Sequence, residues 1–123
     1  MLKKNIILFL SVILLASFFE FIGCSVHSDR GKNVTISWTA NRDTTVNTVG
    51  GGYVVYYSST QGFDTSSAGN VDVPYVSGSL APTSTIIKLN SGTWYIKVEA
   101  YGTSVSGTKI YSQPSTEYTL QVS

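Results

Sequence analysis

Apolar and polar positions follow different patterns in the two parts of this chain. Residues 6–19 form an almost uninterrupted apolar run. From Val34 onward the pattern changes to alternation, in which every second residue is apolar, as in β-strands that bury one face. The first pattern predicts a hydrophobic leader, and the second predicts a domain made of strands.

Segments with this alternation recur along the second part of the chain, separated by turn-forming Gly, Ser, Asn and Pro: residues 34–38, 53–57, 71–76, 87–89, 94–100 and 118–122. The third segment contains Pro74, which cannot donate a ladder hydrogen bond, so we expect it at a sheet edge. Short strands with regular turns are typical of an all-β, two-sheet sandwich. The apolar positions predict a core of Trp38, Tyr53, Val55, Tyr57, Leu89, Trp94, Ile96 and Val98.

The apolar run at the start has the features of an export signal. Lys3 and Lys4 precede it, and its length of about 14 residues is too short for a bilayer span, which needs about 20. A permanent anchor helix is the alternative interpretation. We expect three parts in the chain: a signal peptide at residues 1–23, a tether at residues 24–33 and one domain at residues 34–123.

The run is followed by Phe21-Ile22-Gly23-Cys24, which resembles the lipobox of bacterial lipoproteins in the relaxed form known from spirochaetes. The resemblance implies that the leader is cut before Cys24 and that this thiol carries a covalent lipid with palmitate-type chains. No other cofactor is expected. Phe21 and Glu20 depart from the usual lipobox pattern. Cys24 is the sole cysteine, so no intrachain disulfide can form, and an unmodified thiol is the alternative.

Four segments of the second part resemble a fibronectin type III domain. They correspond, in order, to strand B, strand C, the E–F corner with strand F, and the start of strand G: residues 34–38, 52–57, 89–100 and 111–115. The resemblance implies an immunoglobulin-like two-sheet sandwich. Because only about ten residues separate Cys24 from strand B, we expect strand A to be short or missing. Trp94 stands where the family usually has its corner tyrosine, and its indole N–H is expected to replace the phenol hydrogen bond.

Charge and residue inventory exclude several function classes. Residues 1–24 hold two of the eight basic and one of the seven acidic residues, which leaves six of each in the remainder. Without a basic stripe, nucleic-acid binding is not expected. His27 is the sole histidine, so we expect no metal site. No nucleophile–base pair or pair of close carboxylates is recognisable, and we expect no enzyme activity.

Binding through loops is the remaining possibility. If the family alignment holds, residues 41–52 and 102–109 lie at the same end of the sandwich, and Gly50-Gly51-Gly52 is a flexible stretch before a strand. The candidate contact residues in these loops are Asn41, Arg42, Asp43, Thr103, Ser104 and Ser106. Exposed aromatic side chains also favour interfaces, and the candidates of this kind are Tyr56, Tyr95, Tyr101 and Tyr111.

Together these patterns predict a protein-interaction module, which the resemblance to bacterial lipoproteins places on a lipid anchor in the cell envelope. Its partner would be a host component, an envelope protein or a copy of itself. Ser25, which follows Cys24, favours the outer membrane by analogy with enterobacterial lipoproteins. The alternative is a carbohydrate-binding module, which would need coplanar, solvent-facing tyrosines on one sheet face. Inhibition of an enzyme by loop insertion is a third possibility.

Overall fold

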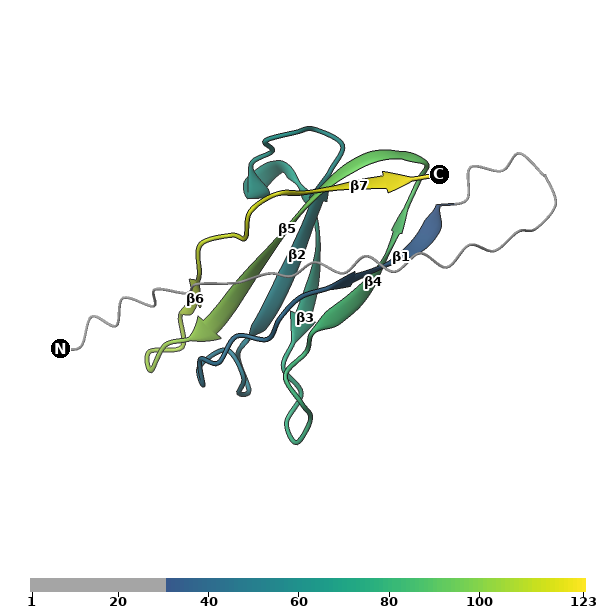
Figure 1. Ribbon diagram of the computed structural model, residues 1–123. Coiled ribbons are helices and arrows are strands. Elements are labelled where there is room, and N and C mark those ends of the chain that lie inside the picture. Colours follow the sequence, from purple (N-terminus) through teal and green to yellow (C-terminus); the bar gives the residue numbers. More distant parts are fainter. Residues whose placement is uncertain (1–30) are drawn as a thin grey trace.

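The longest strand, β5, lies at the centre of the larger of two antiparallel sheets in the computed structural model, which describes residues 31–123 (Figure 1). In this sheet the strand order is β3-β2-β5-β6, and β7 also pairs with β5. The smaller sheet pairs β1 with β4. The strand bounds are β1 Lys32–Ser37, β2 Gly52–Ser58, β3 Gly69–Pro74, β4 Ser84–Leu89, β5 Gly92–Thr103, β6 Lys109–Tyr111 and β7 Tyr118–Val122, with one 3₁₀ turn, η1, at Thr65–Ser67.

This arrangement confirms the predicted all-β, two-sheet sandwich, and its strand order is consistent with a fibronectin type III-like fold. As expected, the strand containing Pro74 lies at an edge. Within residues 31–123 no strand precedes β1. The predicted tether was too long at its end, because Lys32 and Asn33 already pair with Leu89 and Lys88. These two residues are exposed at a strand end, where no alternation marks them.

The core lies between the two sheets. Trp38 packs on Tyr53 with ring centroids 5.2 Å apart, and both side chains are buried. Val55, Leu89, Ile96 and Val98 are buried beside them. Tyr57 and Trp94 are half-buried and pack against this core with their own ring centroids 6.1 Å apart. The Trp94 indole N–H donates to the carbonyl of Asn90 at 2.8 Å, the bond expected from the indole at the corner position.

Two serines keep β5 paired where the neighbouring strand is interrupted between β6 and β7. The Val98 N–H donates to the Ser115 hydroxyl at 2.9 Å, and the Ser115 N–H donates to the Val98 carbonyl at 2.8 Å. Ser112 makes the same two bonds with Ala100, at 3.0 and 2.8 Å. Because these serines replace strand partners, the buried backbone of β5 keeps its hydrogen bonds beside Pro114.

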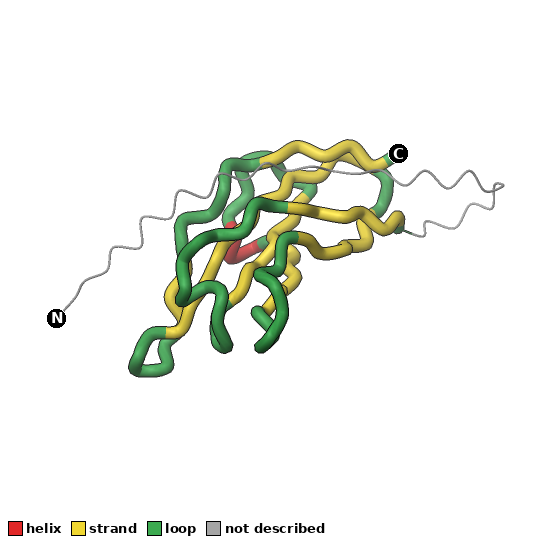
Figure 2. The backbone as a smooth tube through the Cα atoms, turned by 60° about the horizontal axis from the view of Figure 1, so that its bottom comes forward, coloured by secondary structure: helices red, strands yellow, loops and turns green. Residues whose placement is uncertain are grey.

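The strand registers place three loops at one end of the sandwich (Figure 2). We call them the distal loops: residues 38–51 between β1 and β2, residues 75–83 between β3 and β4, and residues 104–108 between β5 and β6. The opposite end holds Lys32, where β1 begins, and Val122, which pairs with Gly92. The chain therefore comes into the sandwich at the end farthest from the distal loops.

Candidate functional site

Backbone and side-chain hydrogen bonds hold the distal loops against one another. The Trp38 N–H donates to the Thr83 carbonyl at 2.8 Å, and the Tyr75 N–H donates to the Gly51 carbonyl at 2.9 Å. The Thr103 hydroxyl donates to the Gly50 carbonyl at 2.7 Å. The structure thus brings the two predicted loops together and adds a third, residues 75–83, which the sequence analysis did not include.

Two predicted contact residues in the first distal loop form its internal frame. The Asn41 N–H donates to the Tyr53 hydroxyl at 2.6 Å, and the Asn41 side-chain oxygen accepts from the Asp43 N–H at 2.9 Å. The Asp43 carboxylate accepts from the N–H and hydroxyl of Thr45 at 2.9 and 2.7 Å. Arg42 between them is exposed. Of the three predicted residues in this loop, only Arg42 leaves its side chain free of these internal bonds.

The glycines of this loop are packed rather than flexible. Gly50 has a φ of 93°, which favours glycine, and Gly51 is buried with no space for a Cβ beside the carbonyl of Val46. Val46 itself is buried in the core. The expectation of a flexible stretch at residues 50–52 is therefore wrong, because close backbone packing explains the glycines.

Hydroxyl groups in the third distal loop also bond within the loop. The Ser104 and Ser106 hydroxyls are 2.8 Å apart, and the Ser104 hydroxyl accepts from the Thr108 N–H at 3.1 Å. The backbone adds a bond from the Ser104 N–H to the Thr108 carbonyl at 2.8 Å. These contacts give the loop a defined shape.

Besides Arg42 and several Thr, Ser and Gly residues, the distal loops expose four aliphatic side chains to solvent. Leu80 is 92% exposed and Val105 is fully exposed, while Val49 and Val76 are each more than 60% exposed. All three loops contribute at least one of these residues. These residues were not predicted, because one apolar residue among Gly, Ser and Thr carries no periodic signal. We call Val49, Val76, Leu80 and Val105 the apolar tips.

A second group of predicted residues lies on the outer face of the larger sheet, which we call the tyrosine face. Tyr95 and Tyr101 alternate with the buried Ile96, Val98 and Ala100 along β5. Tyr56 occupies the same face of β2, and Tyr111 pairs with Tyr101. The four tyrosines therefore share one sheet face.

Two of these four tyrosine hydroxyls donate hydrogen bonds to carboxylates. Tyr56 donates to Glu99 at 2.8 Å, and Tyr101 donates to Asp72 at 2.7 Å. Burial, followed by the hydrogen bond to the carboxylate, raises the pKa of both Tyr56 and Tyr101 well above the usual tyrosine value. Glu99 is only 8% exposed, so its bond to Tyr56 lies largely out of water.

The tyrosine face is not a flat aromatic platform. Tyr101, expected to be exposed, is only 3% exposed, because the ring of Tyr111 packs on it at 5.8 Å and the Lys109 ammonium lies 4.2 Å from its ring centroid. The rings of Tyr101 and Tyr111 meet at 51°. Tyr111 remains 48% exposed. The coplanar arrangement required for sugar stacking is absent from this pair.

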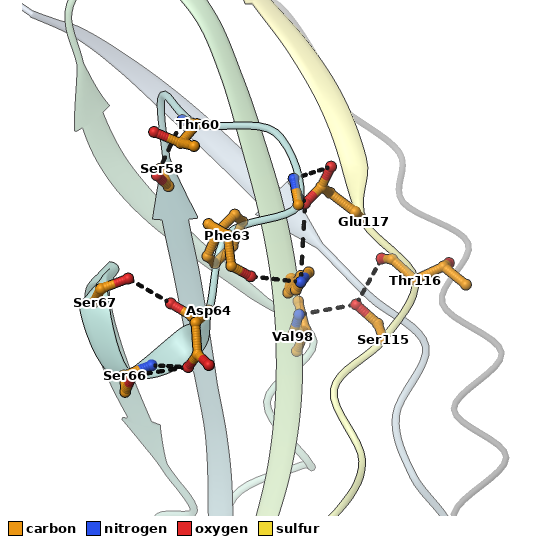
Figure 3. Close-up of polar contacts among 12 residues, drawn as sticks. Ser58, Thr60, Phe63, Asp64, Ser66, Ser67, Val98, Ser115, Thr116 and Glu117 are labelled. Atoms are coloured by element: carbon orange, nitrogen blue, oxygen red, sulfur yellow. Dashed lines mark hydrogen bonds and ion pairs between the residues drawn. The ribbon is translucent and has the colours of Figure 1, made fainter.

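Figure 3 shows polar contacts around the loop at residues 59–68, some of which connect this loop to β5. The Lys97 ammonium donates to the Phe63 carbonyl at 2.8 Å, lies 4.6 Å from the Phe63 ring centroid and lies 3.8 Å from the Glu117 carboxylate. Glu117 also accepts from the Gly62 N–H at 2.9 Å. Each charge has a partner within the cluster, so this arrangement holds the loop in place.

The structure bears on only some of the predictions about lipidation, metal binding and membrane association. Cys24, His27 and the leader lie outside the described residues. Within residues 31–123 no group of three or more His, Cys, Asp or Glu side chains is placed to hold a metal ion. The same part of the chain contains no helix long and apolar enough to cross a bilayer. Comparisons with protein-family models, with curated proteins and with solved structures found no match to this chain.

Proposed function

We propose that this chain is a lipid-anchored cell-envelope protein whose fibronectin type III-like sandwich binds a protein partner through the distal loops. The observation that carries the proposal is the set of apolar tips, exposed together at one end of the sandwich. Exposed apolar groups that gather at one site are typical of interaction surfaces. The end where the chain enters carries no comparable set among the described residues.

The hydrogen bonds between the distal loops support the same function. They fix the backbone that presents the apolar tips, from Trp38 to Thr83 and from Thr103 to Gly50. A loop that is ordered before binding loses less conformational entropy when a partner arrives. The distal loops therefore have the preorganisation that an interaction site needs.

The proposed anchor would orient this surface. If the mature chain begins at lipidated Cys24, residues 25–30 reach at most about 20 Å when fully extended. The twelve residues of β5 span about 40 Å at roughly 3.3 Å each. Since the chain enters at the opposite end, an anchored sandwich can hold its apolar tips well away from the lipid surface.

Site-specific photo-crosslinking in intact cells tests the proposal. A photoreactive residue is placed at Leu80 or Val105 in the full chain, and the matched control carries it at Gln61, exposed in the loop at the opposite end. We expect a discrete adduct of defined mass from both distal positions and none from Gln61. Equal adducts from all three positions, or none from either distal position, would contradict binding through the distal loops.

A carbohydrate-binding module is the second candidate, and the observation in its favour is that Tyr56, Tyr95, Tyr101 and Tyr111 share one face. The buried ring of Tyr101 and its angle to Tyr111 weigh against stacking of a sugar across this face. The distal loops therefore have the stronger case.

A further inference from the structure

The outer edge of β1 offers backbone groups that no other described strand uses. The Trp38 N–H donates to the Thr83 carbonyl across the β1–β4 pair, so Ile36 and Val34, two and four residues earlier, direct their backbone groups toward β4 as well. Asn33, Thr35 and Ser37 consequently direct theirs away from β4. Within residues 31–123, β1 pairs with β4 alone.

This edge lacks the features that usually keep sheet edges from pairing. Its register with β4 runs one to one without a bulge, and β1 contains no proline. The edge strand β3 of the larger sheet differs, because it carries Asp72 and ends in Pro74. Charge and proline are common means of blocking an edge, and β1 has only Lys32 at its start.

Gly31, the first described residue, continues past the last β1–β4 pair at the end of the smaller sheet. It lies beside Lys88, Leu89 and Asn90 of the neighbouring strand end. Gly31 therefore follows the β4 side of β1 and leaves the outer edge uncovered by its own backbone.

We infer that the open edge of β1 pairs with β1 of a second copy of this chain, antiparallel and with Thr35 opposite Thr35. In this register Asn33 lies opposite Ser37, and the outward backbone groups of all three residues find partners. Lys32 lies opposite Trp38 of the second copy, so the two lysines are kept at opposite ends of the pairing. The contact is self-complementary, as a two-fold interface requires.

The outer faces of the two sheets also fit one another in this register. Thr35 lies directly opposite Ile86 of β4, and Ile86 is 63% exposed. Joining two copies would place Ile86, Thr35, Thr35 and Ile86 in one row across four strands. Neighbouring β-branched side chains on one face stabilise a sheet. The pairing would therefore cover part of Ile86, which the single copy exposes.

The contact is small, because it involves one six-residue strand from each copy. Interfaces much below about 1,200 Å² are characteristic of weak and transient contacts. We therefore expect a concentration-dependent dimer. The distal loops lie beyond Ser37 and are left free for a different partner. This inference does not depend on the function proposed for them.

A charge exchange at Thr35 tests the pairing. Two differently tagged full-length copies are co-expressed, extracted in detergent and co-precipitated through one tag. Thr35→Lys in both copies, or Thr35→Glu in both, places like charges directly opposite and should lower co-precipitation about tenfold. Thr35→Lys in one copy with Thr35→Glu in the other should restore it, which also shows that both variants fold.

Thr119→Lys is the matched control, because Thr119 is exposed on β7 of the other sheet. It should leave co-precipitation at the wild-type level. The inference is overturned if wild-type copies do not co-precipitate, if the Thr35 variants bind like wild type, or if the mixed charge pair fails to recover binding. Loss of the apolar tips through Leu80→Ser and Val105→Ser should leave self-association intact and affect only the distal partner.

Discussion

Trp38 joins the smaller sheet to the larger one at the base of the distal loops. Its ring packs on Tyr53, and the Tyr53 hydroxyl in turn accepts the Asn41 N–H. One buried indole therefore supports both the core and the frame of a distal loop. A change here is expected to affect the stability of the domain and the order of the loop together.

Replacing Trp38 with Ala should lower the free energy of unfolding by about 3–5 kcal/mol, because it removes a large buried side chain and leaves a cavity. Chemical denaturation followed by circular dichroism measures the change. Val105→Ala is the control, since the fully exposed Val105 should contribute within about 0.5 kcal/mol. Wild-type stability in Trp38→Ala would show that Trp38 is not a core residue.

Tyr56 and Tyr101 make the domain sensitive to alkaline pH. An unfolded tyrosine has a pKa of about 10, and the folded pKa of both residues is raised by burial and by the adjacent carboxylate. Below pH 10 both the folded and the unfolded chain keep these two protons. The two tyrosines therefore give the free energy of unfolding no pH dependence in this range. Above pH 10 the unfolded chain loses protons that the folded chain retains, and the free energy of unfolding falls.

Tyrosinate absorbance measured against pH tests this expectation. Tyr53, Tyr56 and Tyr101, whose pKa values are all raised, should ionise only as the domain unfolds. Replacing both Tyr56 and Tyr101 with Phe should leave Tyr53 alone in that late step and flatten the fall in stability. Tyr111→Phe, at a half-exposed position, should leave the late step in place. Ionisation of every tyrosine in the folded domain near pH 10 would refute the raised pKa values.

At the scale of the elements, the alternation of apolar residues predicted the strands well, but it did not predict which loop residues are buried. β2, β5 and β7 follow from regular apolar periods, and the indole bond from Trp94 to Asn90 follows from its corner position. Val46 and Phe63 lie in segments without apolar alternation, yet both are buried. A single apolar residue in a loop has no period, so its burial depends on tertiary packing that the local sequence does not contain.

The candidate site was harder to predict for a related reason. Loop polarity pointed to Asn41 and Asp43, whose side chains bond within their own loop. The exposed residues of these loops also include aliphatic ones, such as Leu80 and Val105, which loop polarity does not mark. Short polar side chains favour turns because they can bond to nearby backbone groups. At Asn41 and Asp43, the polar side chains therefore stabilise the shape of their own loop.

The interrupted strand beside β5 depends on serine hydroxyls. Ser115→Ala should lower the free energy of unfolding by about 1–3 kcal/mol, because the buried Val98 N–H loses its acceptor. Thr116→Ala is the matched control, since only the Thr116 backbone carbonyl takes part in the contact. Amide hydrogen exchange at Val98 should accelerate in Ser115→Ala alone. Unchanged exchange would contradict this role of the hydroxyl.

For the whole molecule, the proposed anchor determines where the distal loops can act. Cells supplied with labelled palmitate should label the wild-type chain, while Cys24→Ser should remain unlabelled and leave the membrane fraction. The covalent lipid contributes about 0.8 kcal/mol for each buried methylene, so its loss should release the protein. Labelling that persists in Cys24→Ser would contradict lipidation at this residue.

Protease treatment of intact cells, with a periplasmic protein as control, then reports which side the domain faces. Removal of residues 25–123 while the control survives would place the distal loops outside the cell. Protection would direct the crosslinking search to periplasmic partners.

The route by which the chain enters the sandwich also determines how the domain would bear mechanical load. A pull between the residues before Lys32 and a partner held at residues 75–83 runs along β1 and β4 in opposite directions. All the hydrogen bonds between these two strands then share the force at once and must break together. A pull between Lys32 and the C-terminal end, which lie at the same end of the sandwich, would instead open the strands one bond at a time. The fold is therefore arranged to resist tension along the line from tether to distal loops better than tension between its two termini.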